Sequence, residues 1–130
     1  MSTDVEIRRK EDHLHLVCRG EPSLRPILRA FQQAVSLAEE YGVHVVLIDI
    51  LGLEGPSPEP VERFQFGRVI ARILSRSGSA ICVVFVGLPP ASNPARVAES
   101  GARVRGARVE DFPTLEEARQ WIQEYAAEAN

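Results

Sequence analysis

The chain has 130 residues and a net charge of −3 at pH 7. Its hydrophobic fraction of 45% and charged fraction of 25% are ordinary for a globular domain, and this length is enough for one hydrophobic core. The acidic balance argues against recognition of nucleic acid or of an anionic membrane surface through bulk charge. We therefore expect one domain over residues 1–130 with no nucleic-acid partner.

The first residues and the cysteines indicate a cellular compartment. Residues 1–13 read MSTDVEIRRKEDH, a charged stretch without the apolar core of a signal peptide. No apolar run reaches the length that spans a membrane. Cys18 and Cys82 lie in apolar, strand-like contexts, where a disulfide is one option and buried free thiols fit a cytosolic protein better. These features predict a cytoplasmic protein without membrane insertion.

The chain opens with signals for a hairpin and a helix. Apolar and polar residues alternate over residues 4–8 and again over 13–19, with a turn at 10–12 between them. This pattern predicts a two-stranded hairpin with one polar face. Ser23 is placed to cap a helix whose apolar residues repeat at helical spacing until Gly42 supplies a left-handed stop.

Residues 43–60 are the most informative stretch, and they read VHVVLIDILGLEGPSPEP. An unbroken apolar strand indicates that both of its faces are covered, so we expect a strand over residues 44–50 inside a helix-covered sheet. The following Gly/Ser/Pro loop would leave the carboxyl end of that strand, where open α/β sheets keep their binding sites. We therefore expect Asp49 at the open rim of the sheet, with the next segment displayed to solvent.

The second half predicts alternating helices and strands. Apolar residues such as Phe66 and Ile70 recur at helical spacing over residues 61–75, and Thr114 with Glu117 forms a capping box for a terminal helix. The elements expected between these two helices are a strand over 80–86, a helix over 93–106 and a strand over 107–112. The order β-β-α-β-α-β-α-β-α predicts one α/β domain with a mixed sheet, antiparallel at the hairpin and parallel afterwards, and about four helices.

Three segments in this order resemble the STAS superfamily, named for sulphate transporters and anti-sigma-factor antagonists. They are VVLIDILGLEG at 45–55, RFQFGRVIARIL at 63–74 and RVEDFPTLEEARQWI at 108–122. The chain looks most similar to the stand-alone SpoIIAA-like (STAS/SEC14-type) bacterial domains, whose last helix tends to carry an EEA..W pattern. The resemblance implies a STAS-like fold and a non-catalytic interaction or regulatory module.

The turn after the central strand carries the residue-level likeness. In anti-sigma-factor antagonists this strand ends in Asp-x-Ser-Gly, and a serine that opens the next helix is phosphorylated by the partner kinase. The chain keeps Asp49 and Gly52 in the matching turn and has Leu51 at the serine position. Asp49 either binds a partner or ligand or braces the turn. Ser57, flanked by prolines where the phosphoserine motif is missing, is either a modification site or an ordinary loop serine.

The start of the second helix offers a candidate contact surface. A step of 100° per residue turns Val61 and Phe64 away from the core stripe and places them beside Arg68 and Arg72. An apolar patch rimmed by arginine is typical of a protein contact surface, whereas the alternative is that Phe64 packs under the loop as core. The residues expected to bind a partner or ligand are Asp49, Gly52, Ser57, Val61, Phe64 and Arg68.

Other polar clusters have plainer explanations. His13 and His15 share a strand face at a spacing that can bind a metal, but only His44 could join them, so we expect a solvated polar face. Three arginines either hold an anion or form a solvated rim: Arg103, Arg105 and Arg108. The sequence has no nucleophile elbow, P-loop or dinucleotide fingerprint. We therefore predict no catalytic residue, metal or cofactor.

Three functions are compatible with these observations. The first is a non-catalytic STAS-like module that docks through residues 55–60 and the start of the second helix. The second is a carrier of a small apolar or lipid-like ligand, as the SEC14 side of the resemblance implies. The third is an enzyme that uses Asp49 or the two histidines, and it ranks last. A homodimer is a further expectation, since small domains with an exposed apolar helix face often pair through it.

Overall fold

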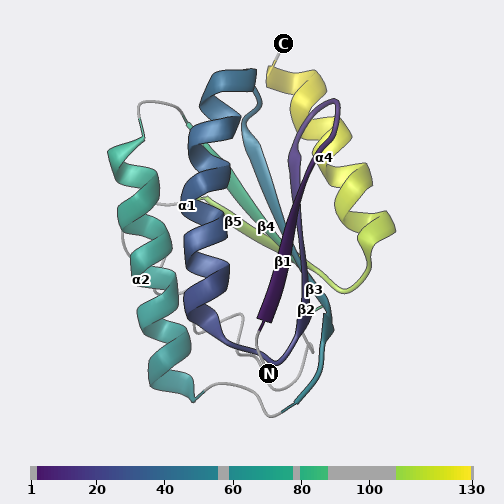
Figure 1. Cartoon of the computed structure of the whole chain (residues 1–130). Helices are drawn as coiled ribbons and strands as arrows, with labels where there is room; N and C mark the ends of the chain where they lie inside the picture. The colour runs from purple at the N-terminus through teal and green to yellow at the C-terminus, as the bar shows by residue number, and fades with distance from the viewer. Residues whose placement is uncertain (1–2, 56–58, 78–79, 88–107, 130) are drawn as a thin grey trace.

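The computed structural model describes residues 3–55, 59–77, 80–87 and 108–129. Within them the chain forms five strands and three helices (Figure 1). In chain order these are β1 (Thr3–Arg9), β2 (Leu14–Gly20), α1 (Leu24–Tyr41), β3 (Val45–Leu53), α2 (Pro60–Arg76), β4 (Cys82–Val86), β5 (Val109–Phe112) and α4 (Leu115–Ala129). No helix of this described part is long and apolar enough to cross a membrane.

The five strands form one mixed sheet in the order β1-β2-β3-β4-β5. β1 and β2 are antiparallel, and the amide of Lys10 donates to the carbonyl of His13 in the turn that joins them. The pairs β2–β3, β3–β4 and β4–β5 are all parallel. The predicted α/β sheet, antiparallel at the hairpin and parallel afterwards, is confirmed. The helix expected over 93–106 lies outside the described residues.

The helices form layers on both faces of the sheet (Figure 1). Leu16, Ile48 and Phe85 belong to the core that α1 and α2 cover, with Phe31 of α1 fully buried among them. The alternate strand residues belong to a second, smaller core under α4. Its buried members are Val45, Leu47, Cys82, Val84, Val86, Ala118 and Ile122. Both faces of the central strands are therefore covered, as their unbroken apolar sequence predicts.

Local signals set most helix ends as expected. α1 begins after Ser23, but the Ser23 side chain makes no capping hydrogen bond, so the predicted cap is wrong. The helix ends at Gly42, whose φ of 74° is the left-handed conformation that glycine adopts without strain. α2 has Pro60 in its first turn, and it ends at Arg76 instead of residue 75. The amide of Glu117 donates to the hydroxyl of Thr114, one half of the predicted capping box. Both cysteines are buried free thiols, and burial raises the pKa of each to about 12.

The central strand is longer than predicted. β3 continues to Leu53 because, beyond a register shift in β2, Gly52 pairs with Arg19 and Leu53 with Gly20. A Cβ on Gly52 would lie 2.9 Å from the carbonyl oxygen of Cys18, so this close pairing requires glycine. The placement of Asp49 at the open rim of the sheet is therefore wrong, because Asp49 lies inside β3.

Candidate functional site

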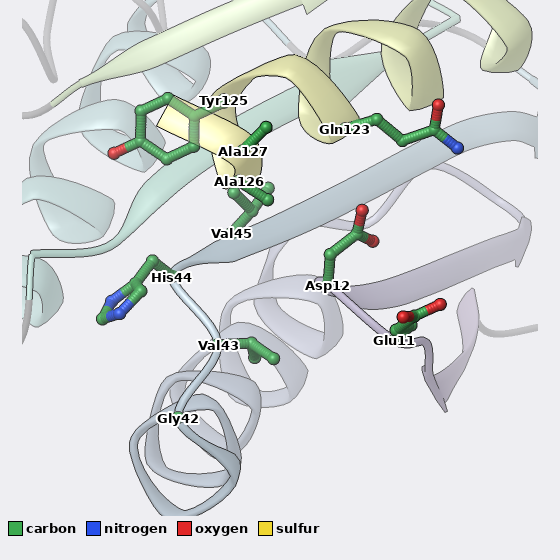
Figure 2. A pocket seen from close by; sticks show the side chains of 10 residues that line it. All are labelled: Glu11, Asp12, Gly42, Val43, His44, Val45, Gln123, Tyr125, Ala126 and Ala127. Carbon is green, nitrogen blue, oxygen red and sulfur yellow. The ribbon is translucent and has the colours of Figure 1, made fainter. Parts of the chain in front are cut away.

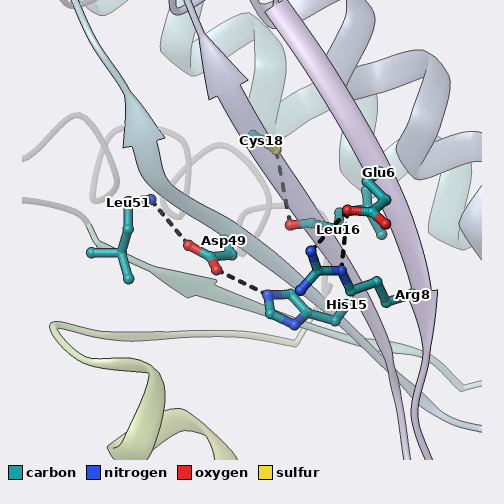
Figure 3. A network of polar contacts seen from close by, with 7 residues as sticks. All are labelled: Glu6, Arg8, His15, Leu16, Cys18, Asp49 and Leu51. Carbon is teal, nitrogen blue, oxygen red and sulfur yellow. Dashed lines mark hydrogen bonds and ion pairs between the residues drawn. The ribbon is translucent and has the colours of Figure 1, made fainter.

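Asp49 is buried in the sheet, with 7% of its surface exposed. One carboxylate oxygen, Oδ1, accepts a hydrogen bond from the amide of Leu51 at 3.0 Å, and Oδ2 lies 2.9 Å from Nε2 of His15 (Figure 3). With its proton on Nε2, the imidazole donates to the carboxylate. Both oxygens are thus engaged within the fold, and this favours the bracing role over direct contact with a ligand.

The two histidines of β2 are buried, so the prediction that they form a solvated polar face is wrong. His13 is 5% and His15 2% exposed. Their neighbours Leu14 and Leu16 point into the core under α1 and α2, so both imidazoles lie on the face that α4 covers. Nδ1 of His13 lies 2.6 Å from Asp12 Oδ1, and the two imidazole centroids are 6.4 Å apart.

Each histidine presents one ring nitrogen to a carboxylate and keeps the other buried. Nε2 of His13 and Nδ1 of His15 have no hydrogen-bond partner among the described residues. In the same part of the chain, no three histidine, cysteine, aspartate or glutamate residues are placed to hold a metal ion. On neighbouring β1, the one ion pair among the described residues joins Arg8 and Glu6, whose side chains are both well exposed. The histidines are thus a buried polar layer between the sheet and α4.

Burial lowers the pKa of His15 below its ordinary value of 6.5. The hydrogen bond and charge of Asp49 act in the opposite direction, while His13 and Arg119 add to the lowering. Loss of hydration is the largest influence, so the folded protein keeps the imidazole neutral where the unfolded chain would protonate it.

Lowering the pH from about 7 to 5 should therefore destabilise the protein through His15. In the unfolded chain His15 takes up a proton as the pH falls below about 6.5, whereas in the folded protein it takes up that proton only at a lower pH. The free energy of unfolding therefore decreases as the pH falls from 6.5 towards the lower pKa of the folded state. Urea unfolding at several pH values measures this dependence. His15→Gln is the matched control, because its amide can still meet Asp49 but does not titrate. Equal pH dependence in both proteins would contradict this role for His15.

The exposed apolar residues gather in one segment. Among the described residues, the large hydrophobic side chains that are exposed are Leu51 (55%), Val61 (67%) and Phe64 (38%). We call residues 51–64 the apolar segment. Its described residues, 51–55 and 59–64, lie at the end of β3 and in the first two turns of α2, at the carboxyl end of the parallel strands (Figure 1).

The outward direction of Val61 and Phe64 is confirmed, and the alternative that Phe64 is core is wrong. Arg68 is exposed one turn further along α2, as predicted. Ser57 lies outside the described residues. Sequence reasoning missed Leu51 as an exposed residue, whose side chain lies against the backbone of Gly87. The sequence signal that could have revealed the exposure of Leu51 is its position after the buried residues of β3 and directly before Gly52.

A shallow pocket of about 410 Å³ lies at the opposite end of β3 (Figure 2). Glu11 and Asp12 of the hairpin turn line one side, and Gln123 and Tyr125 of α4 line another. None of the residues predicted to bind a partner contributes to it. Of the three arginines considered for anion binding, Arg108 lies over the rings of Trp121 and Tyr125. Arg103 and Arg105 lie outside the described residues.

Comparison of the sequence with protein-family models and with curated proteins finds no match.

Proposed function

We propose that the chain is a non-catalytic, STAS-like interaction module that docks on a protein partner through the apolar segment. One observation carries this proposal. The exposed large hydrophobic side chains of the described residues are confined to the end of β3 and the start of α2. A single exposed hydrophobic residue is ordinary on a protein surface, but exposed hydrophobic residues that all fall in one short segment of the chain favour an interface there.

The chemistry around the apolar segment suits protein recognition. Phe64 offers an aromatic anchor, and aromatic residues and arginine are the types that most often dominate binding energy at interfaces. Arg68 follows Phe64 by one helical turn, so an apolar anchor and a positive rim lie side by side on α2. A partner that buries Phe64 would therefore also meet a guanidinium group.

The buried pair of His15 and Asp49 supports a structural role for the polar residues on β2 and β3. Both side chains lie under α4, and the Asp49 carboxylate already accepts two hydrogen bonds from the chain. A docking function needs nothing from this pair except that it holds β3 in place. The end of β3 then presents Leu51 and leads towards α2.

Phe64→Asp should abolish binding of the protein partner while leaving the fold intact. A charge at this exposed position removes the aromatic contact and places a carboxylate inside an apolar interface, which we expect to weaken binding at least about 100-fold. Affinity capture from the native host, followed by titration of the captured protein, measures the effect.

The matched control is Gln65→Asp, which adds the same charge to the neighbouring exposed position on α2. Gln65→Asp should unfold at the same temperature as the wild type within a few degrees, because this position is exposed. Circular dichroism checks that Phe64→Asp, at a position that is 38% exposed, is folded. The proposal fails if Phe64→Asp retains wild-type capture and self-association.

A further inference from the structure

The outer face of α2 carries a row of arginines that form no ion pair with any described residue. The helix contains four arginines and one glutamate. Arg68, Arg72 and Arg76 follow Phe64 at intervals of four residues and are all exposed. No carboxylate within the described residues forms an ion pair with any of these three. Like charges spaced by four residues repel along a helix, so this row lowers the stability of an isolated α2.

α4 carries the complementary arrangement. It contains four glutamates and one arginine. Glu116, Gln120, Glu124 and Glu128 recur at the same interval of four residues, and all are exposed. Glu124 and Glu128 stand in the C-terminal half of the helix, where the helix dipole disfavours negative charge, and the last turn has no basic residue. Positive charge from outside would stabilise this end of α4.

The two rows cannot meet within one molecule. α2 packs on the core that contains Ile48 and Phe85, and α4 packs on the opposite face of the sheet over Leu47 and Val84. The helices therefore lie on the two sides of the domain (Figure 1). The same chain therefore supplies a basic surface on one side of the sheet and an acidic surface on the other.

We propose that α2 of one copy docks on α4 of a second copy, with the Phe64–Arg68–Arg72–Arg76 row facing the Glu116–Gln120–Glu124–Glu128 row. This deepens the proposed function, on which it rests, because it names a second copy of this chain as a partner of α2. Because α2 and α4 lie on opposite sides of the sheet, two copies cannot make both reciprocal contacts at once. The contact is therefore head to tail and leaves one α2 and one α4 without a partner at the ends. Such contacts grow into rings or open chains instead of closing as a symmetric pair.

Head-to-tail contact accounts for both features of the α2 surface. The opposing charges replace the repulsion within each row with attraction between rows. Phe64 lies in the same row as the arginines, so the contact also covers part of the apolar segment. Because the charges are exposed, added salt weakens the contact.

Paired charge reversals test this arrangement. One variant carries Arg68→Glu with Arg72→Glu, which makes both helices acidic. The other carries Glu124→Arg with Glu128→Arg, which makes both helices basic. Sedimentation velocity over a range of concentrations, at low and at high salt, measures self-association, and circular dichroism checks that each variant is folded.

We expect the wild type to associate at low salt and each variant alone to lose at least about tenfold in its self-association constant. Mixing the two variants, or combining all four substitutions in one chain, should restore association, since acidic and basic rows again face each other. A wild type that stays monomeric at low salt overturns the proposal, as does undiminished association of either variant. Failure of both the mixture and the four-fold variant overturns it too.

These outcomes are separate from those for the proposed function. If charge reversal leaves self-association unchanged while Phe64→Asp still abolishes capture of a different protein, only the head-to-tail contact is disproved. If Phe64→Asp also leaves capture unchanged, the docking function fails as well. Gln65→Asp is a charge control for both experiments, because it changes the charge of α2 without removing any member of the row.

Discussion

Replacing Asp49 with alanine should lower the free energy of unfolding by about 3 kcal/mol. The change removes the acceptor for the Leu51 amide and the partner of His15 Nε2, and both lie in the interior or close to it. A buried donor left without an acceptor loses its hydrogen bond to water with nothing in return. His15 would suffer most, because its other ring nitrogen already has no partner among the described residues.

Two control variants make this experiment specific. Asp49→Asn keeps an oxygen for the Leu51 amide and an amide group beside the imidazole, so we expect a loss of only about 1 kcal/mol. Asp111→Ala removes an exposed aspartate from β5 and should change stability by less than about 0.5 kcal/mol. Urea unfolding followed by circular dichroism gives all three values. An Asp49→Ala loss no larger than that of Asp111→Ala would show that the buried pair contributes nothing.

Replacing Ile122 with alanine should also cost about 3 kcal/mol. Ile122 is fully buried, and with Ala118 it forms the part of α4 that is completely enclosed by the sheet. Removing its side chain leaves a cavity between α4 and the strands that carry Val45 and Val84. Because α4 covers the face with His13 and His15, loosening the helix should also hydrate these imidazoles.

Thermal unfolding and the NMR titration of the histidines measure the two effects of Ile122→Ala. The pKa of His15 should rise towards its ordinary value in the variant, because loss of hydration is the main cause of its lowering. Gln123→Ala, at the next and exposed position, is the control and should leave both properties unchanged. A stable Ile122→Ala protein with an unaltered His15 titration would mean that α4 does not enclose this face.

Much of the fold follows from local sequence signals. The hairpin, the end of α1 at Gly42 and the start of α4 at Thr114 each depend on a few neighbouring residues. The mixed sheet follows from the order of the elements, since the connections between parallel strands need crossovers. These features could be predicted because the residues that determine each turn, helix end or strand lie close together in the sequence.

The errors involve partners that are distant in sequence. β3 runs past Ile50 because Gly52 and Leu53 find hydrogen-bonding partners on β2, and the sequence of β3 alone does not reveal that register. His15 is buried because α4, from the far end of the chain, covers its face, and its partner Asp49 is 34 residues away. A polar face on an isolated hairpin is indistinguishable in sequence from a polar layer beneath a helix.

The candidate site divides in the same way. Val61 and Phe64 could be placed by helical geometry alone, because α2 is long and regular enough to fix its exposed side. The structural role of Asp49 could not be predicted in this way, since it depends on the approach of His15 from β2 to the carboxylate. Leu51 was missed because an apolar residue at the end of a buried strand is expected to lie in the core. Its exposure depends on where the neighbouring strand β4 ends, and β4 pairs with β3 only as far as Asp49.

Hydrogen–deuterium exchange of the chain, alone and bound to its captured partner, tests docking through the apolar segment most directly. Binding there should slow exchange in peptides that cover residues 51–64 and leave those from β1 and the hairpin turn unchanged. The Gln65→Asp control should show the same protection. Protection confined to other elements, with exchange over residues 51–64 unaltered, would contradict docking through this segment.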